Sequence, residues 1–141
     1  MLPAMNFDHL PPFEQLRHAA ASQSEPQRLL FVFAAAELPG DATPAQRERF
    51  AAGAGGALEP LMCVDKAPAE LDTFESLVAE SRNAGPAWQV VFAAGLAGRN
   101  GRAPDDAQIE TALHTMVERV RSGRLEGMLA LDRTGDSLTF V

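Results

Sequence analysis

Hydrophobic residues recur at three- and four-residue intervals in three parts of the chain, which is the spacing of one helix face. The first part runs from about residue 12 to 22, the second opens at Pro68, and the third runs from 105 to 122. Pro12 and Pro68 suit helix starts because a missing N–H needs no partner in the first turn. The faces expected to be buried are Phe13, Leu16 and Ala20, then Leu71, Phe74, Leu77 and Val78, then Ile109, Ala112, Leu113, Met116, Val117 and Val120.

A fourth helix is predicted between two of the apolar segments. Thr43, Pro44 and Gln46 form a capping box with proline just inside the helix, and the glycines at 53–56 end it. Phe50 is its only large apolar residue, so we expect a short helix with little hold on a core.

Continuous apolar runs predict the strands. The runs at 28–38 and 89–96 are apolar except at their ends, as in strands buried on both faces. Shorter runs at 58–64 and 127–131 predict two more strands, and a turn at 132–136 leads into a last one at 138–141. Pro60 lacks the N–H that a central strand needs, which places the 58–64 strand at an edge or a strand start.

The two halves of the chain share a helix–strand–helix–strand order, with pseudo-repeats at 12–66 and 73–133. In the alignment that suggests a duplication, Phe13 matches Phe74 sixty-one positions later, Phe33 matches Phe92, and Asp65 matches Asp132. Convergence of the two halves on one α/β pattern is the alternative.

The predicted fold is a single α/β domain over residues 1–141, with a four- to five-stranded sheet and a C-terminal hairpin. A local two-fold axis would place strands 28–38 and 89–96 in the centre and strands 58–64 and 127–131 at the edges. Each strand–helix–strand unit is expected to cross over and give a parallel pair. A fully parallel, flavodoxin-like sheet is the alternative.

Composition excludes several classes of protein. With 12 basic and 19 acidic residues the net charge is −7, which argues against binding to nucleic acid or to an anionic membrane. The chain lacks a run of about 20 apolar residues that could span a bilayer, and no secretory signal is visible, so we expect a cytoplasmic protein. The single cysteine cannot form an internal disulfide, and no cofactor or metal site is predicted.

The segment 98–104 is the one place where both the residue types and the position in the predicted fold indicate a ligand-binding site. It follows a strand expected to be central and precedes a helix, where ligands tend to bind in open α/β sheets. Glycine lets backbone N–H groups point at an anion, and each arginine adds a forked donor. The candidate anion-binding residues are Gly98, Arg99, Asn100, Gly101 and Arg102, and an exposed turn is the alternative.

Three other sets of residues are weaker candidates for a site. Cys63 lies in an apolar run and is expected to be a buried, unreactive thiol. The row Glu110, His114 and Glu118 has metal-ligand spacing but lies beside the apolar stripe, so a solvated row is expected. A pair of carboxylates formed by Asp65 and Asp132 would require two strands that are expected at opposite edges.

Three segments carry a resemblance to a known family. They are PQRLLFVFAAAELP at 26–39, MCVDK at 62–66 and GRNGRAP at 98–104, and the similarity covers nearly the whole chain. The chain resembles small proteobacterial proteins commonly labelled "ribonucleotide reductase subunit alpha". Nucleotide reduction of that kind needs a radical cysteine, a reducing cysteine pair and a large barrel. With one cysteine, the resemblance implies a role associated with the reductase and no catalytic residue.

The leading functional hypothesis is a non-catalytic accessory or protein-interaction protein, because no set of nucleophile, base and oxyanion donors converges in the sequence. The alternatives are a module that binds a phosphorylated or anionic small molecule at 98–104 and an enzyme whose site the sequence does not reveal. A homodimer is also expected, paired through the terminal strand 138–141, which carries no charged side chain.

Overall fold

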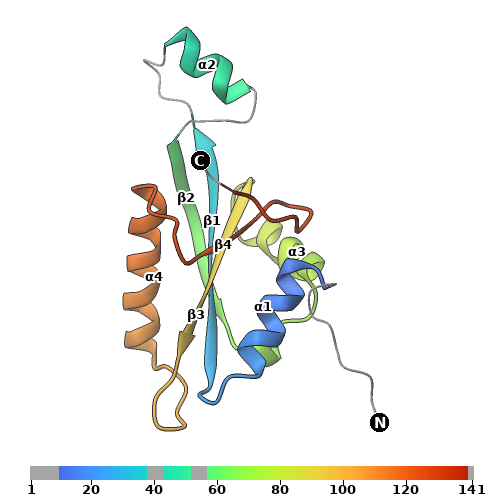
Figure 1. Cartoon of the computed structure of the whole chain (residues 1–141), viewed down its shortest axis with the longest axis vertical. Coiled ribbons are helices and arrows are strands. Elements are labelled where there is room, and N and C mark those ends of the chain that lie inside the picture. Colours follow the sequence, from blue (N-terminus) through green and yellow to red (C-terminus); the bar gives the residue numbers. More distant parts are fainter. Residues whose placement is uncertain (1–9, 38–42, 52–56, 140–141) are drawn as a thin grey trace.

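The computed structural model describes residues 10–37, 43–51 and 57–139, and it has an α/β fold built on one four-stranded sheet (Figure 1). The strand order is β2-β1-β3-β4, and all three neighbouring pairs are antiparallel. The strands are β1 (Gln27–Glu37), β2 (Ala57–Lys66), β3 (Val90–Ala97) and β4 (Leu129–Leu131). The expected order, with the two most apolar strands in the centre, is therefore confirmed.

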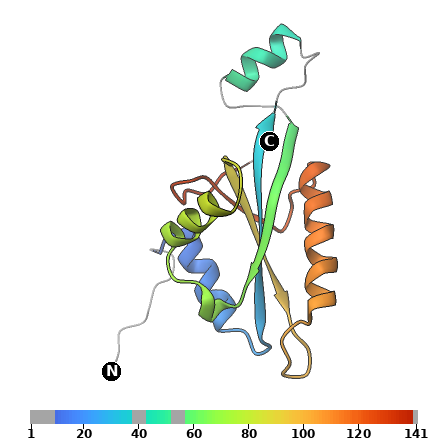
Figure 2. The same ribbon diagram turned by 180° about the vertical axis from the view of Figure 1, so that it is seen from behind.

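Helices cover both faces of this sheet. The α-helices are α1 (Pro12–Ala21), α2 (Pro44–Ala51), α3 (Phe74–Ala84) and α4 (Asp106–Arg121). Figures 1 and 2 show α1 and α3 on one face, α4 on the other, and α2 beyond the end of the sheet. The helix α2 has only one large apolar residue, and it accordingly lies away from both faces of the sheet.

The second predicted helix divides into two elements. Pro68 opens only the short 3₁₀ helix η2 (Pro68–Glu70), and α3 begins after Thr73. The Thr73 hydroxyl accepts a hydrogen bond from the Ser76 amide at 3.0 Å, and the Thr73 amide donates to the Ser76 hydroxyl at 3.2 Å. This reciprocal cap gives α3 a start of its own, so Leu71 follows η2 and lies outside the helix that carries the rest of the predicted hydrophobic stripe.

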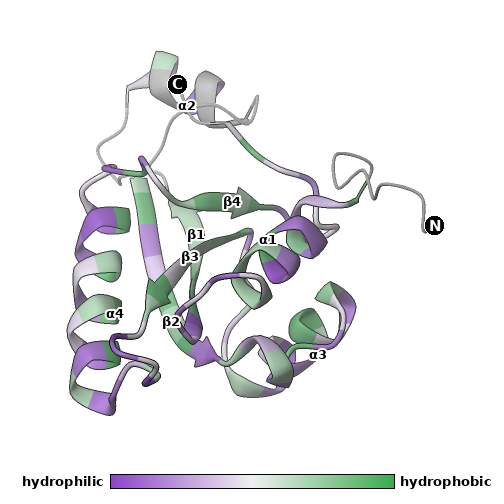
Figure 3. Cartoon of the chain, turned by 60° about the horizontal axis from the view of Figure 1, so that its bottom comes forward, coloured by the Kyte–Doolittle hydropathy of each residue, from purple (hydrophilic) through white to green (hydrophobic). Residues whose placement is uncertain are grey.

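The core has two halves, one on each face of the sheet. Odd-numbered residues of β1 and β3 pack against α1 and α3, and even-numbered residues pack against α4, because successive side chains of a strand point to opposite faces. In Figure 3 the hydrophobic colour follows the sheet between these helices. Among the fully buried side chains are Phe13, Leu29, Phe31, Phe33 and Leu131 on one face, with Val32, Phe92 and Val120 on the other.

The expected parallel pairs within each half are wrong, and so is the fully parallel alternative. In the first half, Glu37 at the end of β1 lies opposite Ala57 at the start of β2. The chain therefore leaves the sheet and re-enters it at the same end. A parallel pair would need the connecting helix to pack across a sheet face. The helix α2 offers no apolar stripe for such packing, and the two strands therefore form a long-looped hairpin.

The proposed residue match between the halves is also wrong at its centre. Phe33 belongs to the α1 and α3 side of the core, and Phe92 belongs to the α4 side. A two-fold axis perpendicular to the sheet preserves faces, so it cannot superpose these two residues. Phe13 and Phe74 do lie on one face, with ring centroids 5.4 Å apart. The duplication itself stays a prediction.

Each edge of the sheet has one irregularity, a bulge beside Pro60 in β2 and an isolated bridge after β4. The register of β1 with β2 shifts between Phe33 and Ala34, whose partners are Met62 and Pro60, so the proline lies at a bulge of an edge strand as expected. At the other edge, Leu131 forms an isolated bridge with Ser137. Residues 138 and 139 do not form the last predicted strand, and residues 140 and 141 lie outside the described part of the chain.

Candidate functional site

The predicted anion-binding segment folds as a tight two-residue turn. Asn100 and Gly101 both have positive φ, 54° and 76°, as in the mirror-image turns that join antiparallel strands. Arg99 and Arg102 flank them and exchange both backbone hydrogen bonds, at 3.0 and 2.9 Å. The exposed-turn alternative therefore describes the local geometry.

Four of the five backbone N–H groups of the segment 98–102 already have acceptors within the protein. The Gly98 amide donates to the Pro26 carbonyl at 2.8 Å, and the Gly101 amide donates to the Glu25 carboxylate at 2.8 Å. The Arg99 and Arg102 amides each donate to the other residue's carbonyl, so the predicted anion cradle is reduced to the Asn100 amide and two exposed guanidinium groups. The helix that follows is capped by Asp105, whose carboxylate accepts from the Gln108 amide at 2.8 Å.

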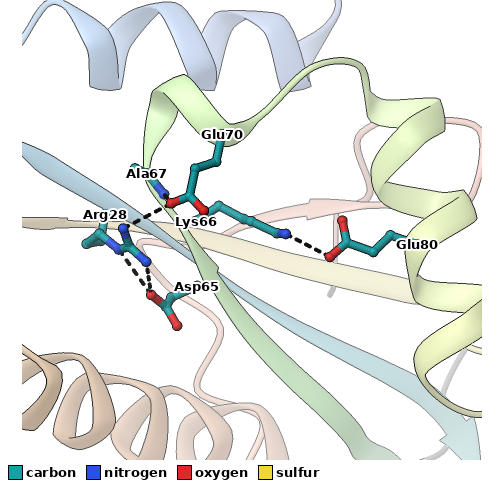
Figure 4. A network of polar contacts seen from close by, with 6 residues as sticks. All are labelled: Arg28, Asp65, Lys66, Ala67, Glu70 and Glu80. Carbon is teal, nitrogen blue, oxygen red and sulfur yellow. Dashed lines mark hydrogen bonds and ion pairs between the residues drawn. The ribbon is translucent and has the colours of Figure 1, made fainter.

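Next to this turn, an ion-pair network fastens the end of β2 (Figure 4). The Arg28 guanidinium donates to the Asp65 carboxylate at 3.0 and 2.5 Å and to Glu70 at 3.1 Å. The hydrogen bonds to Asp65 and its charge raise the pKa of Arg28 against the effect of burial, and Glu70 raises it further. Lys66 donates to Glu80 at 2.7 Å. Because these cations have carboxylate partners, we assign the network a structural role.

The single cysteine is exposed, so its expected burial in the core is wrong. Cys63 lies on the edge strand β2, where only one neighbouring strand covers the backbone and side chains on the α4 side border a groove. Partial burial raises the pKa of the Cys63 thiol, and the negative charge of Asp65 raises it further. A raised pKa disfavours the thiolate, which is the nucleophilic form.

We expect Cys63 of the native protein to react stoichiometrically with a thiol reagent, faster as the pH rises, because only the thiolate reacts. Asp65→Asn removes one of the two causes of the raised pKa and should speed labelling at pH 8, whereas Glu59→Gln on the same strand should not. Stopped-flow labelling measures both rates. Reaction that requires denaturant would contradict the exposed position.

The groove beside Cys63 gathers polar residues from two elements. It has a volume of about 470 Å³ and is lined by Asp65 of β2 and by Asp106, Glu110 and His114 of α4, among others. In the described part of the chain, no three His, Cys, Asp or Glu side chains are grouped to hold a metal ion. Glu110, His114 and Glu118 are exposed, which agrees with the expected solvated row. Glu118 pairs with Arg121 at 2.7 Å.

The two aspartates considered as a catalytic pair are not brought together. Asp65 lies on β2 and Asp132 follows β4, at opposite edges of the sheet. The carboxylate of Asp132 instead organises its own turn, accepting from the Thr134 hydroxyl at 2.6 Å and from the amides of Thr134 and Asp136 at 2.8 and 3.1 Å. The hydrogen bonds from Thr134 lead in lowering the pKa of Asp132.

The longest open feature of the sheet is the outer side of β2. The carbonyls of Pro26 and Ala34 accept hydrogen bonds from the β3 side. The backbone N–H and C=O groups of even-numbered β1 residues therefore point toward β3, and those of odd-numbered residues point toward β2. Val64, opposite Phe31, therefore bonds to β1, while the backbone groups of Cys63, opposite Val32, point away from it. Among the described residues, no other strand pairs with this side of β2.

No family model, curated protein or solved structure was found to be similar to this chain. No helix among the described residues is both long enough and apolar enough to cross a membrane.

Proposed function

We propose that this protein is a non-catalytic interaction protein that binds an extended segment of a partner chain along the outer side of β2. The observation that carries the proposal is the ten-residue length of this edge strand. A strand at a sheet edge presents a row of unpaired N–H and C=O groups, which is the template used in β-strand addition. Natural edges are commonly protected by charge, proline, bulges or shortness, and β4 at the other edge is only three residues long. Despite Pro60 and the bulge beside it, β2 keeps a regular stretch from Met62 to Lys66.

The chemistry of the edge fits an antiparallel added strand. Pro60 contributes no N–H, and the bulge beside it limits the regular part to the segment from Met62 to Lys66. The outward N–H and C=O groups of this segment belong to Cys63 and Asp65. A partner would thus gain up to four main-chain hydrogen bonds from two residues (roughly one donor and one acceptor each).

A substitution at one position tests the proposal. Cys63→Pro removes an N–H that points away from β1 and should abolish strand addition, whereas Cys63→Ser keeps this N–H and is the matched control. We expect a partner captured by the wild type and by Cys63→Ser to be lost from Cys63→Pro, with similar urea unfolding of all three proteins. Equal capture by the folded Cys63→Pro variant would exclude the β2 edge.

Light scattering on a sizing column separates self-association from a different partner. A dimer that Cys63→Pro converts to a monomer would identify the added strand as β2 of a second copy. A dimer that survives this variant but is lost on truncation after Gly135 would instead support pairing through the terminal strand 138–141.

Two further functions remain as proposals. Anion binding by the segment 98–104 is favoured by Arg99 and Arg102, whose exposed guanidinium groups have no carboxylate partner among the described residues. An association with ribonucleotide reductase, as the resemblance implies, is tested by adding purified reductase subunits to the same capture experiment with the Cys63 variants.

A further inference from the structure

A small pocket between α3 and the turn that follows β4 has an unusual set of ionisable residues. Its volume is about 150 Å³, and its lining includes Arg82 at the end of α3, the segment 85–87, Trp88 and Arg133. Among the described residues that line it, the two arginines are the only ionisable ones, although the chain as a whole has a net charge of −7. The local charge is thus opposite in sign to that of the protein.

Four arginines elsewhere in the described chain are neutralised by carboxylates. Ion pairs join Arg17 to Glu14, Arg28 to Asp65 and Glu70, Arg119 to Glu126, and Arg121 to Glu118. Neither Arg82 nor Arg133 has a carboxylate partner among the described residues. The acid next to Arg133 in the chain, Asp132, is committed to its own turn. Two guanidinium groups are therefore available to an external anion.

The floor of the pocket is rigid and fully hydrogen-bonded. The Trp88 indole N–H donates to the Ser81 hydroxyl at 2.8 Å, and this hydroxyl donates to the Val78 carbonyl at 2.6 Å. Trp88 is only 2% exposed and packs edge-on against Phe33, with ring centroids 5.1 Å apart. Ser81 is the one buried polar residue of the described core. These contacts hold the segment that carries the pocket.

The same floor orients Arg133. Its Nε donates to the Trp88 carbonyl at 2.6 Å, and its guanidinium carbon lies 6.0 Å from the centre of the Trp88 ring. This position is a cation–π contact and fixes the plane of the guanidinium. Only one of its donor groups is used, so the two terminal nitrogens remain available for a bidentate contact with an oxyanion.

We propose that this pocket binds a phosphate group between Arg82 and Arg133. The volume is well below the roughly 300 Å³ at which sites for drug-sized molecules begin, so the ligand enters as a small group. Two positive charges without a carboxylate match a dianion, and a phosphate group carries about −1.5 to −2 at pH 7. Free phosphate and the phosphate of a small monoester share this chemistry.

Isothermal titration with inorganic phosphate tests the proposal on the full chain. We expect saturable binding at millimolar phosphate, also with sulfate as a second dianion, and none with acetate. Arg82→Gln should weaken binding about tenfold or more, and Arg82→Gln with Arg133→Gln should abolish it. Titration with phenyl phosphate shows whether a monoester is preferred to the free ion.

The matched control is Arg124→Gln, which removes an exposed arginine that belongs neither to this pocket nor to the turn 99–102. This variant should bind phosphate like the wild type. Arg133 also donates a hydrogen bond to the Trp88 carbonyl, so urea unfolding of each variant checks that the fold is kept. The variant Arg82→Gln leaves this hydrogen bond in place. Absence of saturable binding to the wild type would overturn the proposal. Unchanged binding to Arg82→Gln, or equal loss in the control, would also overturn it.

Discussion

Phe31→Ala is expected to lower the free energy of unfolding by about 3–5 kcal/mol, the range for a large aromatic side chain deleted from a packed core. Phe31 is 1% exposed and lies in the central strand β1, under the helices α1 and α3. Its ring centroid is 6.4 Å from that of Phe13. Since helices cover this face, the deletion leaves a cavity that water and backbone movement cannot readily fill.

Urea unfolding followed by circular dichroism measures this effect. Leu138→Ala is the control, because Leu138 is 38% exposed and a surface truncation is expected to change stability by less than about 0.5 kcal/mol. A loss below about 1 kcal/mol for Phe31→Ala would mean that the sheet is not covered on this side.

Gly98→Ala is expected to cost about 3 kcal/mol, the upper end of the usual range for overpacking. A Cβ atom at this position would overlap the carbonyl oxygen of Arg102 and lie 3.0 Å from that of Pro26. Both are backbone atoms that accept hydrogen bonds from the turn or its flank, so no side chain can move aside. The turn must open, and its backbone hydrogen bonds are lost with it.

The neighbouring glycine provides the control for this prediction. Gly101 has a positive φ of 76°, but an added Cβ would meet nothing within 4 Å. Gly101→Ala therefore carries only the backbone strain of the left-handed region, about 1–2 kcal/mol. Thermal unfolding of both variants compares them, and equal losses would show that crowding at Gly98 has no effect.

The helices and their buried faces could be predicted from the sequence because each depends on local spacing and local caps. In α4, the predicted stripe supplies the buried residues Ile109, Met116 and Val120. Strand direction could not be predicted in this way. For β1 and β2 it depends on whether the connection after Glu37 packs on the sheet, and a helix with one large apolar residue allowed either outcome. For β3 and β4 the connecting helix α4 does pack on the sheet, and the strands are nevertheless antiparallel.

Only those features of the candidate site that depend on residues adjacent in the sequence were predictable. The turn at 99–102 is predictable from its Asn-Gly pair. The Glu25 carboxylate, which accepts the hydrogen bond of the Gly101 amide, comes from a distant part of the chain and was not predictable. The exposure of Cys63 could not be predicted even with its strand expected at an edge, because an apolar run does not show that a groove lies between this edge and α4. The pocket of Arg82 and Arg133 was missed because no sequence pattern joins a helix end to a later turn.

The pairing of Glu37 with Ala57 has a practical consequence for engineering. Every residue between them connects two strand ends that are already neighbours, so the sheet places no demand on the length of that connection. The entropy of closing a loop grows only with the logarithm of its length, about 0.6 kcal/mol for each doubling. A fluorescent domain or an epitope can therefore be inserted in the segment 38–56, and the register of β1 with β2 is expected to survive the exchange.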